Sequence, residues 1–165
     1  MVGAGGSLGV TPDRLSSCAL LELRGANISE RLRPPGFRPL RIVVTDDDAQ
    51  VLAALVRMLT EAGHAVFAAY DGRSACELAQ YIPDLDLVIS NTRICNVNVP
   101  ELIVRVRELK PWLAILHIGD VLPQEGPLRG VASLSEPFTS GELLAAITTL
   151  LAARGQGSAG RPTKH

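Results

Sequence analysis

The sequence predicts an α/β domain in which a parallel sheet lies between two layers of helices. Short apolar runs alternate with longer segments whose apolar residues recur at helical spacing, and the alternation continues from residue 41 to residue 153. The apolar runs are continuous and rich in β-branched residues, as is typical of strands buried on both faces. Five such βα units imply a three-layer sandwich with the sheet in the middle.

The expected strands are short segments that end where polar or turn residues begin. In chain order they are RIVVT at 41–45, HAVFAA at 64–69, LDLVIS at 85–90, AILHIG at 114–119 and VASLS at 131–135.

Capping residues indicate where the first helices begin. Asp48 precedes a helix whose apolar residues recur at helical spacing until Gly63, and Asp71 with Gly72 opens a second helix that runs to residue 82. Asn98 and Pro100 mark the start of a third helix, because proline suits the first turn.

The two remaining connections differ from each other. The segment DVLPQEGPLRG at 120–130 contains proline and glycine at positions that permit only a short or broken helix. The last helix begins with a capping box, formed by Thr139 and Glu142. A shortened helix would expose Val121, Leu122 and Leu128 as a partner surface, unless these residues pack under their own loop.

The two ends of the chain differ in composition from the segment between them. Residues 1–40 are rich in glycine, proline and arginine, and residues 154–165 are polar and contain glycine. We therefore expect a mostly flexible N-terminal extension over 1–40, one domain over 41–153 and a flexible tail over 154–165.

Composition narrows the class of protein. The net charge is −1 with 47% hydrophobic residues, and no basic stripe is present, so we expect no nucleic-acid partner. No apolar stretch is long enough to span a membrane or to serve as a signal peptide. Three cysteines without a close pair suit reduced thiols, and we expect a cytoplasmic protein.

Polar side chains gather where the expected strands end. Asp46 and Asp47 follow the first strand, Asn91 the third, Gly119 lies at the end of the fourth, and Glu136 follows the fifth. In open parallel sheets, ligands bind at the carboxyl ends of the strands. These positions therefore form the candidate site.

Four stretches between residues 41 and 147 together resemble the receiver domain of two-component response regulators. They are RIVVTDDDAQVLAALVRMLTEAGHAVFAAYDG, PDLDLVISNTRI, NVNVPELIVRVRELKP and SEPFTSGELLAAI, in the expected order and spacing. The resemblance implies a flavodoxin-like fold with strand order 2-1-3-4-5 and a place in bacterial two-component phosphorelay signalling. In that family an aspartate accepts a phosphoryl group, an acidic pair helps to hold Mg²⁺, and a hydroxyl and a lysine contact the phosphoryl oxygens.

Carried over by position, the resemblance leaves only part of that set in this chain. Asp46 and Asp47 match the acidic pair, but Asn91 stands at the phosphoacceptor position, Gly119 at the hydroxyl position and Glu136 at the lysine position. An amide is not a usable nucleophile, glycine has no hydroxyl, and glutamate repels a phosphoryl dianion. These departures indicate a degenerate pseudo-receiver.

Two further positions carry family expectations. Ser133 stands where the family has an aromatic switch residue, and Pro137 is a candidate cis-proline. His117, inside the fourth strand, is expected to be a core histidine and not a ligand or phosphoryl carrier.

The acidic pair permits two interpretations. Asp46 and Asp47 can retain weak Mg²⁺ binding, helped by Glu136, because three carboxylates in one pocket need a cation or a proton between them. Alternatively, the pair is solvated and Asp48 only caps its helix. No cofactor is required in either case.

The sequence thus favours a stand-alone, non-enzymatic receiver-like protein that acts by binding a protein partner, either a histidine kinase or another regulator. The same surfaces would also allow a homodimer. The alternative is a phosphorylation-competent single-domain response regulator with an atypical Mg²⁺-dependent phosphoacceptor site. A nucleotide or flavin binder is disfavoured, because TDDDAQ places acid where a phosphate-binding loop needs glycine.

Overall fold

The computed structural model describes residues 36–91 and 97–155. The fold below is that of the unit Pro39–His165. Most of the expected N-terminal extension and C-terminal tail lie outside the described residues. Among those that are described, no helix is long and apolar enough to cross a membrane.

Five parallel strands form one sheet in the order β2-β1-β3-β4-β5, which confirms the predicted topology. The strands span Arg41–Thr45 (β1), Ala65–Ala69 (β2), Leu87–Asn91 (β3), Ala114–Ile118 (β4) and Ala132–Leu134 (β5). Every residue of β3 and β4 is buried, as the continuous apolar runs predict for central strands.

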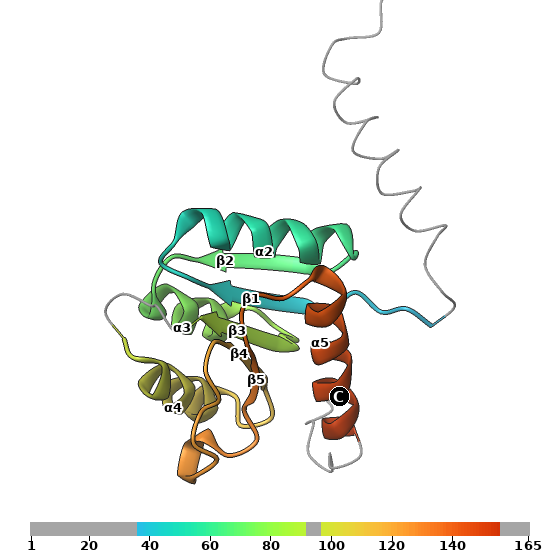
Figure 1. Cartoon of the computed structure of the whole chain (residues 1–165). Helices are drawn as coiled ribbons and strands as arrows, with labels where there is room; N and C mark the ends of the chain where they lie inside the picture. Colours follow the sequence, from blue (N-terminus) through green and yellow to red (C-terminus); the bar gives the residue numbers. More distant parts are fainter. Residues whose placement is uncertain (1–35, 92–96, 156–165) are drawn as a thin grey trace, which may run out of the picture. The chain divides into compact units, whose positions relative to one another are not determined.

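Four α-helices cover the two faces of the sheet (Figure 1). They span Ala49–Glu61 (α2), Gly72–Tyr81 (α3), Val99–Leu109 (α4) and Ser140–Gly155 (α5). The last of these extends two residues beyond the expected domain boundary at 153. Side chains of alternate strand residues point to opposite faces, so the sheet has two separate cores.

The first core lies between the sheet and α3 with α4, and Val43, Val88 and Ile115 contribute to it from the strands. The second lies between the sheet and α2 with α5, and it contains Val44, Ile89 and Leu116. The predicted three-layer sandwich is therefore confirmed.

The capping residues act as the sequence predicts. Asp48 accepts hydrogen bonds from the N–H groups of Gln50 (2.8 Å) and Val51 (3.3 Å) at the start of α2. Asp71 and Asn98 cap α3 and α4 in the same way. Asp48 and Asp71 follow the ends of β1 and β2 within three residues, so these two caps help to fix how the chain leaves those strands.

A capping box opens the last helix, as predicted. The Thr139 N–H donates to Glu142 Oε2 at 2.6 Å, and the Glu142 N–H donates to Thr139 Oγ1 at 3.2 Å.

The connection between β4 and β5 contains only a 3₁₀ turn, η1 (Gly126–Leu128), in place of an α-helix, which agrees with the predicted short or broken helix. Its apolar residues do not form one exposed surface. Leu122 and Leu128 pack against the core on the α3–α4 side, and only Val121 is exposed, at 76%. Of the two alternatives, the structure therefore shows packing of the loop against the core and no partner surface made of all three residues.

Candidate functional site

The five candidate positions lie at one edge of the sheet, at the carboxyl ends of β1, β3, β4 and β5. Because β1 and β3 are neighbours, the residues that end these two strands meet directly. This is the position where open parallel sheets place their ligand chemistry.

Asp46 is the central residue of the site, and only 1% of it is exposed. Its Oδ1 accepts a hydrogen bond from the backbone N–H of Asp48 at 2.8 Å, and its Oδ2 accepts one from the side-chain amide of Asn91 at 2.6 Å. A buried carboxylate needs such donors, because leaving it without compensation costs several kcal/mol.

The contact between Asn91 and Asp46 shows how the site tolerates a buried acid. A carboxylate oxygen can only accept, so the nitrogen of the Asn91 amide must face it. Hydrogen bonds to a charged acceptor are roughly twice as strong as neutral ones. Two neighbouring carboxylates would need a cation or a proton between them. In this chain Asn91, 9% exposed, donates a hydrogen bond to the single buried carboxylate instead.

Asp47 and Asp48 have separate environments although they follow Asp46 directly. Both are exposed, and Asp48 is occupied by the start of α2. The three aspartates therefore do not form one charge cluster. One is buried in the site, one lies at the surface and one caps a helix.

Gly119 follows β4 with a backbone φ of +134°, a conformation that residues with a side chain rarely adopt. Its N–H donates to the carbonyl of Leu134 at 2.9 Å and thereby ties the end of β4 to β5. The family hydroxyl is absent here, and the backbone itself is shaped for glycine.

Glu136 is exposed, and the Glu136–Pro137 peptide bond is cis. Within the described residues, Glu136 makes no ion pair or hydrogen bond with another side chain. Ser133 precedes Glu136 inside β5, where it pairs with His117 of β4, and it is half-buried.

A row of polar side chains lies one residue inside the site, and sequence reasoning did not identify it. Thr45, Ser90, His117 and Ser133 are register partners across β1, β3, β4 and β5. His117 is 1% exposed, which agrees with the expected core histidine. Desolvation lowers the pKa of His117 below its ordinary value of 6.5, although Ser90 and Asp120 oppose the shift. The available signal was the alternation of strand residues, which places Ser90 on the same face of β3 as Val88 and opposite to Ile89.

In this structure the Asp46 carboxylate is occupied by hydrogen bonds, and weak Mg²⁺ binding at the acidic pair stays a prediction. Both oxygens of Asp46 already accept hydrogen bonds, and the donor on Oδ2 is an amide nitrogen, which is not a ligand for a hard cation. In the part of the chain that the structure describes, no three His, Cys, Asp or Glu residues are arranged to hold a metal ion. Glu136 therefore does not complete a three-carboxylate set with Asp46 and Asp47.

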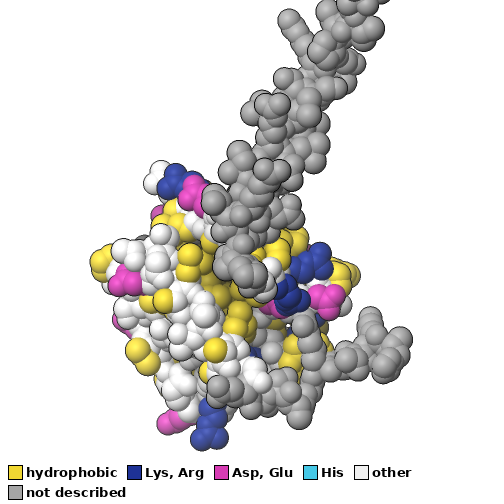
Figure 2. All heavy atoms as spheres, turned by 90° about the vertical axis from the view of Figure 1, so that its right-hand side faces the viewer, with side chains coloured by type: hydrophobic (Ala, Val, Ile, Leu, Met, Phe, Trp, Pro, Cys, Tyr) yellow, Lys and Arg dark blue, Asp and Glu magenta, His cyan; other side chains and the backbone are white. Residues whose placement is uncertain are grey.

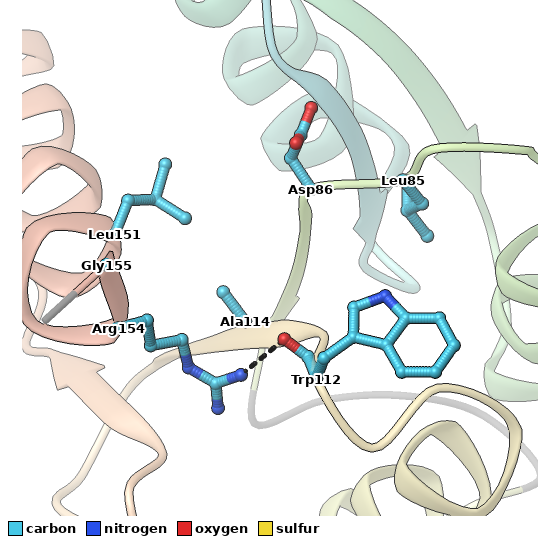
Figure 3. A pocket seen from close by; sticks show the side chains of 7 residues that line it. All are labelled: Leu85, Asp86, Trp112, Ala114, Leu151, Arg154 and Gly155. Atoms are coloured by element: carbon cyan, nitrogen blue, oxygen red, sulfur yellow. Dashed lines mark hydrogen bonds between the residues drawn. The ribbon is translucent and has the colours of Figure 1, made fainter. Parts of the chain in front are cut away.

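A small pocket of about 170 Å³ lies at the opposite edge of the sheet (Figure 3). It is lined by Asp86 and Ala114 at the amino ends of β3 and β4, by Trp112, and by Arg154 of α5. Arg154 donates to the carbonyl of Trp112 at 2.8 Å and to that of Leu113 at 2.7 Å. These bonds fasten the end of α5 to the sheet, far from the candidate site.

Charged side chains of both signs are interspersed on the face shown in Figure 2. The salt bridges of the described residues are exposed pairs four residues apart, such as Arg105–Glu101 at 2.6 Å. Such pairs contribute little stability and form no field of one sign.

Comparison with known proteins gives one consistent family. No family profile matches the sequence. The transcriptional regulatory protein TcrA of Mycobacterium tuberculosis is 32% identical over 116 residues, which cover 67% of this chain and 46% of TcrA. The chain thus spans about half the length of this curated relative.

Solved structures extend the similarity to whole receiver chains. A response regulator receiver protein from Sinorhizobium medicae is 30% identical with a TM-score of 0.61, covering 71% of this chain and 98% of that one. The chemotaxis response regulator CheY4 of Vibrio cholerae is 26% identical with a TM-score of 0.62, covering 68% of this chain and 99% of that one.

The fold, the position of the acidic pair and these relatives agree with the resemblance seen in the sequence. The chain belongs to the response regulators of two-component signalling, and its described domain is a CheY-like receiver domain.

Proposed function

We propose that this chain is a pseudo-receiver, which acts in a two-component pathway by binding a protein partner and does not take up a phosphoryl group. The partner would be a histidine kinase or another regulator, and no enzymatic step is assigned to the chain. The observation that supports this most is the 2.6 Å hydrogen bond from the Asn91 amide to buried Asp46.

The acceptor position lacks a nucleophile. The lone pair of the Asn91 amide nitrogen is delocalised into the carbonyl, and this nitrogen is engaged as a donor to Asp46. A phosphoryl group needs an oxygen or nitrogen that can attack phosphorus in line. The exposed Asp47 is not at the end of β3, where the acceptor position lies.

The surrounding positions oppose a phosphoryl group as well. Glu136 adds negative charge where the family has a cation, and no side chain replaces the lost hydroxyl at Gly119. Among the described candidate residues, a dianion at this edge would therefore meet Asp46, Asp47 and Glu136, and none of these three supplies the positive charge that stabilises phosphoryl transfer.

The amide–carboxylate contact would also replace the switch between two conformations that phosphorylation drives in the family. In a phosphorylated receiver, the new charge changes the balance between two conformations. Here the Asn91–Asp46 bond joins the ends of β1 and β3 in the absence of any phosphoryl group, so partner binding would be independent of any phosphodonor.

The proposal is tested by incubating the full chain with Mg²⁺ and a small phosphodonor and measuring its intact mass. The expected result is an unmodified chain. A labile adduct with the mass of one phosphoryl group would overturn the proposal and favour the atypical phosphoacceptor. Asn91→Asp is the matched variant, and it should remain poorly labelled because Gly119 and Glu136 are unchanged.

A further inference from the structure

The two edge strands of the sheet, β5 and β2, differ in how strongly they discourage pairing with a strand of another chain. The edge strand β5 has three residues and is followed by Glu136 and Pro137, and both short strands and proline discourage pairing with another chain. The other edge strand, β2, has five residues with the sequence AVFAA, with no charge, proline or bulge in its register with β1. An uncharged, regular edge strand is a template for a further strand.

The backbone of β2 presents free pairing groups at this edge. The N–H of Ala65 donates to the Leu40 carbonyl at 2.8 Å, and the Ala69 carbonyl accepts from the Asp46 N–H at 3.3 Å, so both residues direct these groups toward β1. Backbone groups of successive strand residues point to opposite sides. Val66 and Ala68 therefore direct their N–H and carbonyl groups away from the sheet.

We propose that a second copy of this chain pairs with β2 in antiparallel orientation, with a twofold axis at Phe67. Val66 then lies opposite Ala68 of the second copy, and the reverse pair follows from the symmetry. Each of these two pairs exchanges two backbone hydrogen bonds, which gives four in total. The two five-stranded sheets become one continuous sheet across the dimer.

The side chains of β2 are compatible with pairing to their own copies. Phe67 meets the same residue of the second copy at a non-hydrogen-bonded pair, where side chains are closest and aromatic pairs add stability. Phe67 is partly buried against the core on the α3 side, so its position is already fixed before pairing. No like charges face each other, because AVFAA has none.

The helices that cover β2 add an argument for a copy of the same chain. Each carries an exposed Arg–Glu pair four residues apart, Arg57–Glu61 in α2 and Arg73–Glu77 in α3. A twofold axis through β2 relates each helix to an antiparallel copy of itself. Where such a helix meets its antiparallel copy, Arg of one copy can pair with Glu of the other, as an isologous interface requires, and no like charges need to face each other.

The first test is the mass of the full chain in solution, measured by light scattering or sedimentation over a range of concentrations. We expect a dimer of twice 17.5 kDa. Ala68→Lys places like charges across the axis at an exposed position, and it should weaken the dimer about tenfold or more. The matched control is Ala145→Lys on the exposed side of α5, which should leave the dimer unchanged.

Amide hydrogen exchange on the unmodified chain gives a second test that does not depend on a variant folding. The amides of Val66 and Ala68 should become protected as the protein concentration rises. A monomer at millimolar concentration would refute the proposal, as would a dimer that Ala145→Lys breaks and Ala68→Lys does not. A dimer in which these two amides exchange at the same rate at all concentrations would also refute it. None of these outcomes depends on whether the chain accepts phosphate.

Discussion

Replacing Asn91 with aspartate tests whether the amide is what stabilises the buried acid of the site. The substitution removes the 2.6 Å hydrogen bond to Asp46 and puts a second carboxylate beside one that is 1% exposed. Losing a hydrogen bond to a charged group costs about 1.5–3 kcal/mol. Two charges about 4 Å apart repel by about 4 kcal/mol at an effective dielectric constant of 20.

These two contributions overlap, because the carboxylates can separate or share a proton. We therefore expect Asn91→Asp to lower the free energy of unfolding by about 2–4 kcal/mol at neutral pH without divalent cations. Acid should reduce the loss, since protonation of one carboxyl restores a donor. Mg²⁺ should also reduce it, whereas the unmodified chain should gain no stability from Mg²⁺.

The assay is urea unfolding of the unmodified chain and of Asn91→Asp, each with and without Mg²⁺. Asn91→Ala is the control for loss of the hydrogen bond alone, and Mg²⁺ should not rescue it. The double variant with Asp46→Asn exchanges the two partners and should recover much of the stability. Equal stability of Asn91→Asp and the unmodified chain in the absence of Mg²⁺ would refute the reasoning.

Three further predictions concern neighbouring residues. Gly119→Ser should lower the stability by about 1–3 kcal/mol, measured by urea unfolding, because φ is +134° there; an unchanged midpoint would contradict this. Asp48→Ala removes the cap of α2 and should cost about 0.5–2 kcal/mol in the same assay, with Gln50→Ala, exposed and bonded to the cap only through its backbone N–H, as a near-neutral control. Because burial lowers the pKa of His117, this residue does not change the free energy of unfolding with pH above pH 6.5. Below that value the unfolded chain binds the proton more readily, so the free energy of unfolding falls. Stability measured from pH 7 to pH 5 should therefore fall less steeply in His117→Gln, and identical slopes would exclude this role.

The fold could be predicted because its signals are local. Asp48, Asp71 and Asn98 lie at helix starts where their side chains cap free N–H groups, and the apolar runs mark the strands within one or two residues. The common edge of the candidate site residues could also be predicted, since each follows a strand that ends there.

The contacts between these residues could not be predicted from the sequence. The spacing of Asp46 and Asn91 does not show whether an amide faces the acid or whether Glu136 turns toward the pair, because both depend on side-chain directions. The polar row with His117 depends on the register between four strands. Leu122 and Leu128 also show this limit, because a loop rich in proline and glycine gives no periodic signal of which residues it buries.

The most direct test of the account is whether the site can hold a phosphoryl group at all. Beryllium fluoride with Mg²⁺ mimics a bound phosphoryl group without requiring a reaction. The result therefore does not depend on how fast a phosphodonor reacts. The titration would follow backbone amide signals near Asp46, Asn91 and Gly119 by NMR. The account predicts no saturable change, and a saturable shift at these three residues would contradict it.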